Sequence, residues 1–184
     1  MNKVIHKPVL IVIAGPNGSG KTSVTSKILH HEWMEDSMDA IMQAAKYSED
    51  LREQCLLEHK SLIFETVLSA KDKVDYICRA IHAGFFVRLF FVCTASPTIN
   101  ASRIANRVME GGHDVPIPKI ISRYHKSLLN CCLVSKLADR TYIYDNSIEN
   151  SDATLLFRLT KGQLAKQYVD VIPEWAYPIC NSDF

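Results

Sequence analysis

Four short runs rich in apolar residues, each about as long as a β-strand, mark the first part of the pattern along this chain. The runs cover residues 9–14, 61–66, 85–92 and 140–145, and the first is apolar throughout. Continuous apolar runs of this length predict strands that are buried on both faces, as in a parallel sheet.

Between these runs, the apolar positions follow a helical spacing. The spacing predicts helices over residues 21–31, 37–60, 71–83, 97–110 and 118–137. Gly84 suits the residue after a helix end, and Ser96 followed by Pro97 suits a helix start.

Two last apolar runs, at 154–160 and 163–169, flank Lys161 and Gly162 and predict a small C-terminal hairpin. Strands that alternate with helices predict an α/β fold, a parallel sheet with helices on both faces. Without repeats or linkers, residues 1–184 are expected to form a single domain. A helical lid is expected at about 103–124, and the hairpin and tail at about 150–184.

Composition and charge narrow the function classes. The chain has 184 residues, 47% of them apolar, and a formal net charge of +1. Because the net charge is small, no strong electrostatic field of the whole protein favours a nucleic-acid or membrane partner. No apolar run is long enough to span a bilayer. The six cysteines contain no C-x-x-C pair. Reduced core thiols and a cytoplasmic location are therefore expected.

The strongest chemical signal directly follows the first strand. It is a G-x-x-x-x-G-K-T phosphate loop, comprising Gly15, Pro16, Asn17, Gly18, Ser19, Gly20, Lys21, Thr22 and the adjoining Ser23. Its backbone amides suit a cradle for phosphates, Lys21 a contact to the β- and γ-phosphates, and Thr22 a ligand of Mg²⁺. The motif predicts binding of ATP with Mg²⁺; the alternative is a glycine-rich turn that binds nothing.

Glu65 and Thr66 end the second predicted strand, at the edge where parallel sheets present active-site groups. The carboxylate would accept a hydrogen bond from the substrate or hold Mg²⁺ through water. The alternative is a polar pair that only caps a neighbouring loop. The strand over 85–92 runs into Cys93 and Thr94 without the acid that ends a Walker-B strand, so Glu65 is the nearest substitute.

Three arginines are candidates for phosphate contacts from the lid. Arg103 and Arg107 lie one turn apart on a predicted helix, and Arg123 follows the Gly-Gly break on the next helix. Planar guanidinium groups suit phosphate oxygens and the charge that develops in phosphoryl transfer. The alternative is a helical hairpin with solvated arginines. His113, between Gly112 and Asp114, would contact the substrate or brace the turn.

Asp145 and Asn146 end the last core strand, where a nucleobase often packs; a turn-forming pair is the alternative. The aromatic residues Tyr142, Tyr144, Trp175 and Tyr177 indicate core and tail packing in preference to a platform for base stacking.

The segments GPNGSGKTS, LIFETVLS, RVMEGGHDVPIPKIISRYHKSL and YIYDNS, in this order, resemble the zeta-toxin family of P-loop kinases. The resemblance covers about residues 8–175. It implies a P-loop kinase fold and phosphorylation of a nucleotide-sugar hydroxyl with ATP and Mg²⁺. It assigns Lys21 and Thr22 to ATP and Mg²⁺, Glu65 and Thr66 to the acceptor, and Arg107 and Arg123 to the lid.

One family element has no match. Zeta toxins carry a second strand that ends in Asn-x-Asp, whose aspartate is the proposed base for the acceptor hydroxyl. Here no residue in 30–39 matches the motif; Asp36 or Asp39 would substitute for the aspartate, and the alternative is that each starts a helix as an N-cap or first-turn acid. Loss of this strand would expose the edge of the neighbouring strand, unless a second copy of the chain covers that edge in a homodimer.

Two principal hypotheses follow, with a third behind them. The first is a small-molecule kinase of zeta type, and the second is an ATP-binding protein that has lost turnover with the base-bearing strand. The third, a nucleotide or polynucleotide kinase, calls for a basic groove. The sequence leaves the acceptor, an antitoxin partner and the oligomeric state open.

Overall fold

The computed structural model describes residues 7–29 and 49–180. The segment in which the Asn-x-Asp strand is predicted to be absent, with Asp36 and Asp39, lies outside these residues. The first part of the helix predicted over 37–60 lies outside them as well. The elements are β1 (Val9–Ala14), α1 (Lys21–Leu29), α3 (Glu49–Leu57), β2 (Leu62–Thr66), α4 (Lys71–His82), β3 (Phe86–Cys93), α5 (Pro97–Met109), α6 (Ile117–Leu137), β4 (Arg140–Asp145), β5 (Thr154–Thr160), β6 (Gln163–Gln167), η2 (Glu174–Ala176) and α7 (Tyr177–Cys180).

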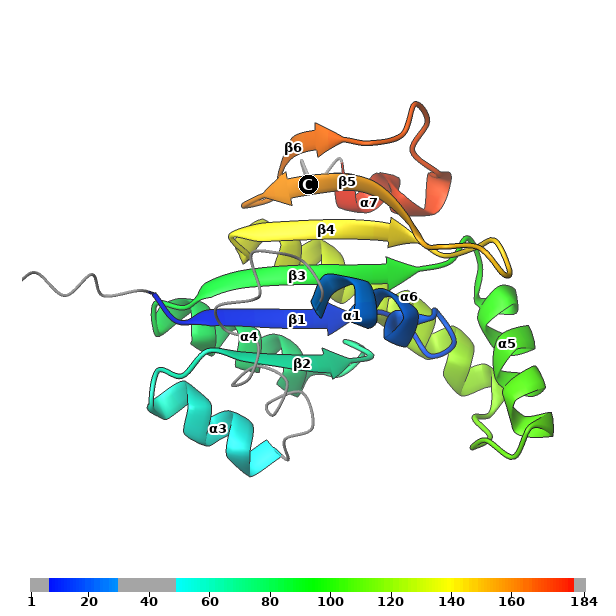
Figure 1. The fold of residues 1–184 in the computed structure, drawn as a ribbon, viewed down its shortest axis with the longest axis horizontal. Helices are drawn as coiled ribbons and strands as arrows, with labels where there is room; N and C mark the ends of the chain where they lie inside the picture. The colour runs from blue at the N-terminus through cyan, green and yellow to red at the C-terminus, as the bar shows by residue number, and fades with distance from the viewer. Residues whose placement is uncertain (1–6, 30–48, 181–184) are drawn as a thin grey trace, which may run out of the picture.

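The strands form one mixed sheet in the order β2-β1-β3-β4-β5-β6 (Figure 1). The first four are parallel, while β5 and β6 are antiparallel to their neighbours. The predicted C-terminal hairpin exists, but it extends the main sheet instead of standing apart. Phe157 pairs with Ile143 of β4, and both side chains are fully buried, so joining the sheet buries the hairpin's apolar face.

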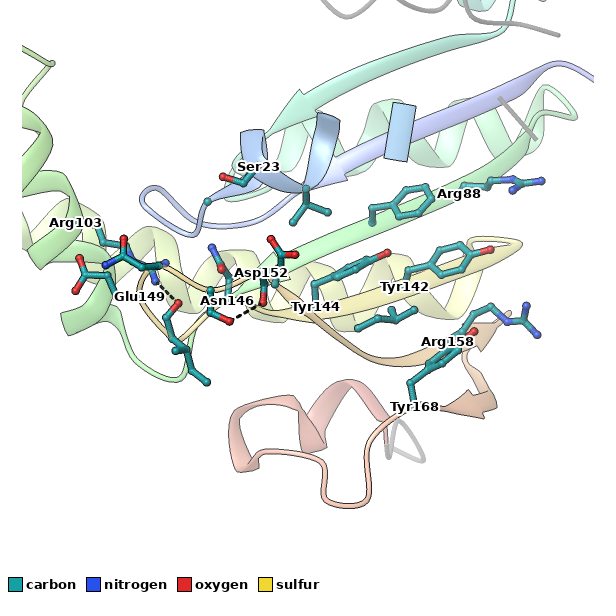
Figure 2. Close-up of a pocket in the computed structure, with 18 of the residues that line it drawn as sticks. Ser23, Arg88, Arg103, Tyr142, Tyr144, Asn146, Glu149, Asp152, Arg158 and Tyr168 are labelled. Carbon is teal, nitrogen blue, oxygen red and sulfur yellow. Dashed lines mark hydrogen bonds between the residues drawn. The ribbon is translucent and has the colours of Figure 1, made fainter. Parts of the chain in front are cut away.

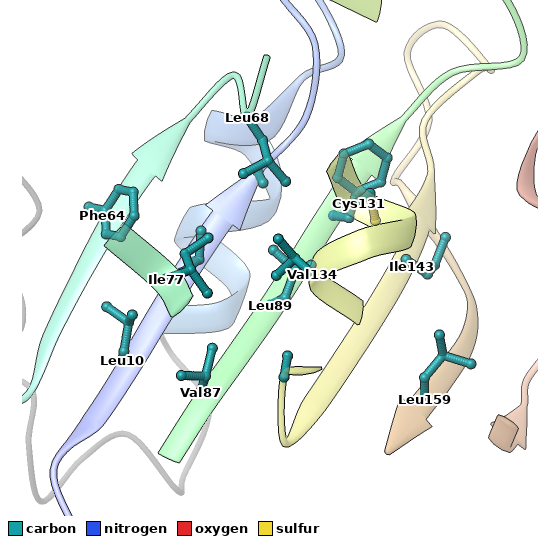
Figure 3. Close-up of a cluster of buried hydrophobic side chains, with 14 of the residues drawn as sticks. Leu10, Phe64, Leu68, Ile77, Val87, Leu89, Cys131, Val134, Ile143 and Leu159 are labelled. Atoms are coloured by element: carbon teal, nitrogen blue, oxygen red, sulfur yellow. The ribbon is translucent and has the colours of Figure 1, made fainter. Parts of the chain in front are cut away.

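One face of the sheet carries the larger core. Alternate strand residues such as Leu10, Phe64 and Leu89 pack against α4 and α6, whose Ile77 and Val134 are fully buried (Figure 3). The opposite face carries a smaller cluster that includes Ile11, Ile63 and Val92, packed with Val24 of α1. The period-two alternation of strand side chains therefore divides the apolar runs between two layers of helices.

Most predicted boundaries agree with the structure to within one or two residues. Helix α4 ends before Gly84, which has a φ of +85°. Ser96 and Pro97 begin α5, although the Ser96 side chain makes no capping hydrogen bond. All six cysteines are free thiols. Among the described helices, none is both long and apolar enough to cross a membrane.

Candidate phosphate and nucleotide site

The phosphate loop joins the carboxyl end of β1 to the first residue of α1. Lys21 is 9% exposed, and its ammonium donates to the carbonyl oxygens of Gly15 at 2.9 Å and Pro16 at 3.1 Å. The Gly15 amide donates to Thr66 O of β2 at 3.2 Å. The loop is thus curled around the lysine and tied to the neighbouring strand end.

Two glycines are needed at this loop because other parts of the chain approach it closely. A Cβ on Gly15, whose φ is +153°, would lie 2.0 Å from Val92 O. Gly20 has a φ of +83° and faces the side chain of Asn146. Neither position has room for a side chain, and L residues rarely adopt these backbone angles.

Three distant side chains brace the loop from outside. Asn100 of α5 is fully buried, accepts a hydrogen bond from the Thr94 hydroxyl, and donates to Asn17 O at 2.6 Å. Asn146, after β4, donates to Ser19 O at 2.8 Å, and Arg123 donates to the Asn17 side-chain oxygen at 3.2 Å. These contacts fix the loop before any phosphate arrives, which lowers the entropic cost of binding.

A cavity of about 300 Å³ opens in front of the loop and gathers many of the predicted site residues. Its lining consists of Asn17, Gly18, Gly20, Lys21, Thr22, Glu65, Thr66, Val67 and Arg107. Burial lowers the pKa of Lys21, the nearby Glu65 carboxylate raises it, and Arg107 lowers it again. Two cations beside one carboxylate make the cavity suited to a polyanion.

The remaining predicted residues lie in different places. Arg123 reaches the loop through Asn17, as described above. Arg103 points to the other side of α5, where it donates to Ile148 O at 3.4 Å and lines a second cavity with Ser23. His113 is exposed in the turn between α5 and α6. Arg103 and Arg107 therefore do not share one cavity, although they lie one turn apart.

Helix α6 holds the end of β2 in position. Ser127 donates to Val67 O, and Asn130 donates to Leu68 O at 2.8 Å. One turn earlier, Tyr124 donates to Thr94 O at 2.6 Å, just after β3. Sequence reasoning missed these residues and Asn100, since polar side chains within an amphipathic helix give no signal of the loops they contact.

The residues present fit a magnesium ion, although no cluster of acids is found among the described residues. Mg²⁺ is commonly bound by one or two protein oxygens together with phosphates and waters. The Thr22 hydroxyl and the Glu65 carboxylate line the same cavity. Burial raises the pKa of Cys93, which ends β3, to about 12, so its thiol stays protonated and is a poor ligand.

A larger cavity, of about 890 Å³, continues from Gly20 along the α1 side of β3, β4 and β5 (Figure 2). Its end near the loop is formed by Asn146 and the segment 148–153. Asp145 accepts hydrogen bonds from the backbone and hydroxyl of Ser147, which makes it a turn residue. Gly20 lines both cavities, so a nucleotide with phosphates in the smaller one would extend its nucleoside into the larger one.

No family model matches the sequence, and no curated protein matches it either. Solved structures do match. A chain of the AvrRxo1-ORF1:-ORF2 complex superposes with a TM-score of 0.61 at 14% identity, covering 86% of this chain and 60% of that one. A chain of the same complex with ATP gives a TM-score of 0.61 at 15% identity, with coverages of 88% and 61%.

A chain of the PezAT chromosomal toxin–antitoxin system of Streptococcus pneumoniae superposes with a TM-score of 0.58 at 14% identity, covering 99% of this chain and 82% of that one. This chain therefore shares its fold with the AvrRxo1 and PezAT chains. It spans about 60% of the length of the AvrRxo1 chains it resembles.

Proposed function

We propose that this chain is an ATP-dependent kinase, which transfers the γ-phosphoryl group of ATP to a hydroxyl of a small acceptor of the nucleotide-sugar class. The observation that carries the proposal is the smaller cavity, where Lys21, Glu65 and Arg107 meet at a braced phosphate loop. The fold is that of zeta-toxin-like kinases, and a similar structure contains ATP.

The donor's phosphates would bind to the loop amides and to Lys21, whose ammonium would exchange the carbonyls of Gly15 and Pro16 for phosphate oxygens. Thr22 would hold Mg²⁺ together with phosphate oxygens and waters, and the ion would neutralise charge on the β- and γ-phosphates. Arg107 would stabilise the negative charge that grows on the transferred group.

The acceptor would approach from the side of Glu65 and Thr66. Its hydroxyl oxygen forms a bond to Pγ, the bond between Pγ and the bridging oxygen breaks, and ADP leaves with that oxygen. The hydroxyl proton passes to the Glu65 carboxylate, which is exposed to the cavity. Glu65 would therefore act as the base in place of the Asn-x-Asp aspartate of zeta toxins.

The test is transfer of labelled γ-phosphate from ATP·Mg²⁺ to UDP-N-acetylglucosamine and a panel of nucleotide-sugars. Lys21→Ala should abolish both transfer and tight ATP binding. Glu65→Gln should lower turnover by about 10²–10⁴-fold with ATP affinity nearly unchanged, since it removes the base but not the phosphate contacts.

Equal, negligible transfer by the wild type and Glu65→Gln would overturn the kinase proposal. ATP binding that disappears in Lys21→Ala would then favour an ATP-binding protein without turnover. Transfer to oligonucleotide 5′-hydroxyls instead would favour the polynucleotide kinase.

We further propose that the chain acts in the cytoplasm as the toxin of a toxin–antitoxin pair. The likeness to a PezAT chain supports this proposal. Induction of the wild-type chain should arrest growth of a bacterial host, and induction of Lys21→Ala should not. Equal growth of both strains at matched expression would contradict it.

A further inference from the structure

Three arginines lie side by side across the sheet, on the face that also carries α1. Arg88 of β3 pairs in register with Arg140 of β4, and Arg158 of β5 pairs with Tyr142, two residues further along β4. Residues paired in register, and residues two apart on a strand, point to the same face. All three arginines line the 890 Å³ cavity.

Aromatic rings hold this cluster in place. The guanidinium groups of Arg88 and Arg140 both lie over the ring of Phe86, at 5.3 Å and 5.8 Å from its centre. Phe90 and Tyr142 stack beside them with ring centres 4.6 Å apart. Figure 2 shows the side chains of Arg88 and Arg158 on either side of Tyr142, directed away from the phosphate loop.

Two arginines of the cluster, Arg140 and Arg158, have no balancing acid on the described part of the chain. Neither Arg140 nor Arg158 forms an ion pair with a carboxylate there, and the buried Nε of Arg158 has no hydrogen-bond partner. Burial lowers the pKa of Arg88, the neighbouring Tyr142 raises it, and Arg140 lowers it. Like charges held together in a half-buried site lower stability unless an anion binds there.

The cluster is separate from the phosphate loop. Arg140 begins β4 and Asp145 ends it next to the loop, so the two ends are about 16 Å apart at about 3.3 Å per residue. A triphosphate bound at Lys21 would therefore have its phosphates at the opposite end of the strand from the arginines. Between the two ends, the cavity is lined by Tyr142 and Tyr144.

We propose that this end of the cavity is a second anion site, which binds a small phosphate ester of a ring compound, such as a nucleoside monophosphate. Arg140 and Arg158 hold the phosphate, and the ring lies along Tyr142 and Tyr144. Guanidinium forks match phosphate oxygens, and aromatic side chains stack with planar rings. The site does not depend on the chain being a kinase.

The experiment uses the Lys21→Ala variant of the full chain, in which the loop has lost its lysine. Binding of AMP, pyrophosphate and adenosine to this variant is measured by titration calorimetry at low salt. The measurement is then repeated on a variant that also carries Arg140→Gln and Arg158→Gln. AMP should still bind to Lys21→Ala, and adenosine should bind to it at least tenfold more weakly than AMP. The two added substitutions should lower the affinity for AMP at least tenfold. Binding should also weaken as salt rises.

Arg79→Gln is the matched control, because Arg79 is an exposed arginine of α4 that pairs with Glu53 of α3 and does not line the larger cavity. It should leave AMP binding unchanged. Thermal unfolding of each variant shows that it is folded. AMP binding that is equal with and without Arg140 and Arg158 would overturn the proposal, because it would place AMP near Asn146. Failure of both AMP and pyrophosphate to bind Lys21→Ala would overturn it as well.

Discussion

The side-chain amide of Asn146 stands where a side chain on Gly20 would have to be: a Cβ on Gly20 would lie 2.1 Å from Asn146 Nδ2. The same amide donates to Ser19 O at 2.8 Å. The residue after β4 therefore closes the phosphate loop from the nucleoside side, and the loop can have no side chain there.

This contact predicts the effects of two substitutions and of their combination. Asn146→Ala removes one hydrogen bond from the loop and should weaken ATP binding by about 1 kcal/mol, or roughly fivefold. Gly20→Ala should abolish ATP binding, because it adds a clash to an unfavourable φ. The double variant should regain part of the binding, since only the clash is relieved. ATP titration of all three tests this; a double variant no better than Gly20→Ala would show that backbone strain alone decides.

Lys21 should lower the stability of the folded protein, although the proposed function assigns it to ATP binding. Its pKa in the folded protein lies below the ordinary 10.5, chiefly through burial, so the unfolded chain binds this proton more tightly. Stability therefore rises with pH between the folded pKa and 10.5, and the charged ammonium is unfavourable at neutral pH. Lys21→Met should raise Tm at pH 7.5 by about 2–4 °C, the shift expected for about 1 kcal/mol in a chain of this size.

The gain should shrink as the pH approaches 10.5, because the wild-type lysine then loses its proton in the folded state. Thermal unfolding of both proteins from pH 7 to 10 provides the measurement. A lower Tm for Lys21→Met at pH 7.5 would mean that the hydrogen bonds to Gly15 and Pro16 outweigh the cost of burial.

Arg107 and Arg103 should differ in what they do to the reaction. Arg107 lines the phosphate cavity, so Arg107→Ala should lower kcat by at least about 100-fold. Arg103 lines the larger cavity and binds Ile148 O, so Arg103→Ala should mainly raise KM for ATP. Steady-state kinetics separate the two effects, and Arg79→Ala is the exposed control. Equal losses of kcat in both variants would place the two arginines in one site after all.

Asn100 and Asn130 allow a matched comparison of two loops. Each donates from its side-chain amide to a carbonyl, Asn100 to Asn17 of the phosphate loop and Asn130 to Leu68 after β2. Asn100→Ala should lower stability by about 2 kcal/mol and weaken ATP binding, since it leaves buried groups unpaired. Asn130→Ala should instead raise KM for the acceptor. A reduced ATP affinity in Asn130→Ala alone would contradict this assignment.

Local patterns predicted the parts of the fold and site that depend on neighbouring residues. The phosphate loop, the strand ending in Glu65 and Thr66 and the break after Met109 could all be read from the sequence, because each is specified within a few residues. The meeting of Lys21 and Glu65 in one cavity follows from parallel strand ends lying at one edge of the sheet, and helix α5 adds Arg107 to it.

What the sequence did not reveal depends on long-range pairing. Asn100 is separated from Asn17 by 83 residues, and nothing in its helix distinguishes it from a solvated asparagine. Arg103 and Arg107 were expected on one face, but Arg103 lines the larger cavity and Arg107 the smaller one. Arg88, Arg140 and Arg158 became neighbours only through the strand register, which a single sequence does not show.

Helix α6 contacts chain segments that the proposed function assigns to the donor site and to the acceptor site. Within two turns, it contacts the phosphate loop through Arg123, the end of β3 through Tyr124 and the segment after β2 through Ser127. Because one helix contacts all three segments, a tilt of α6 would move them together. The positions of the two proposed substrates would then change together. Substitutions in its buried seam should therefore change the KM values for both substrates in correlation, and selection on one of them would act on both.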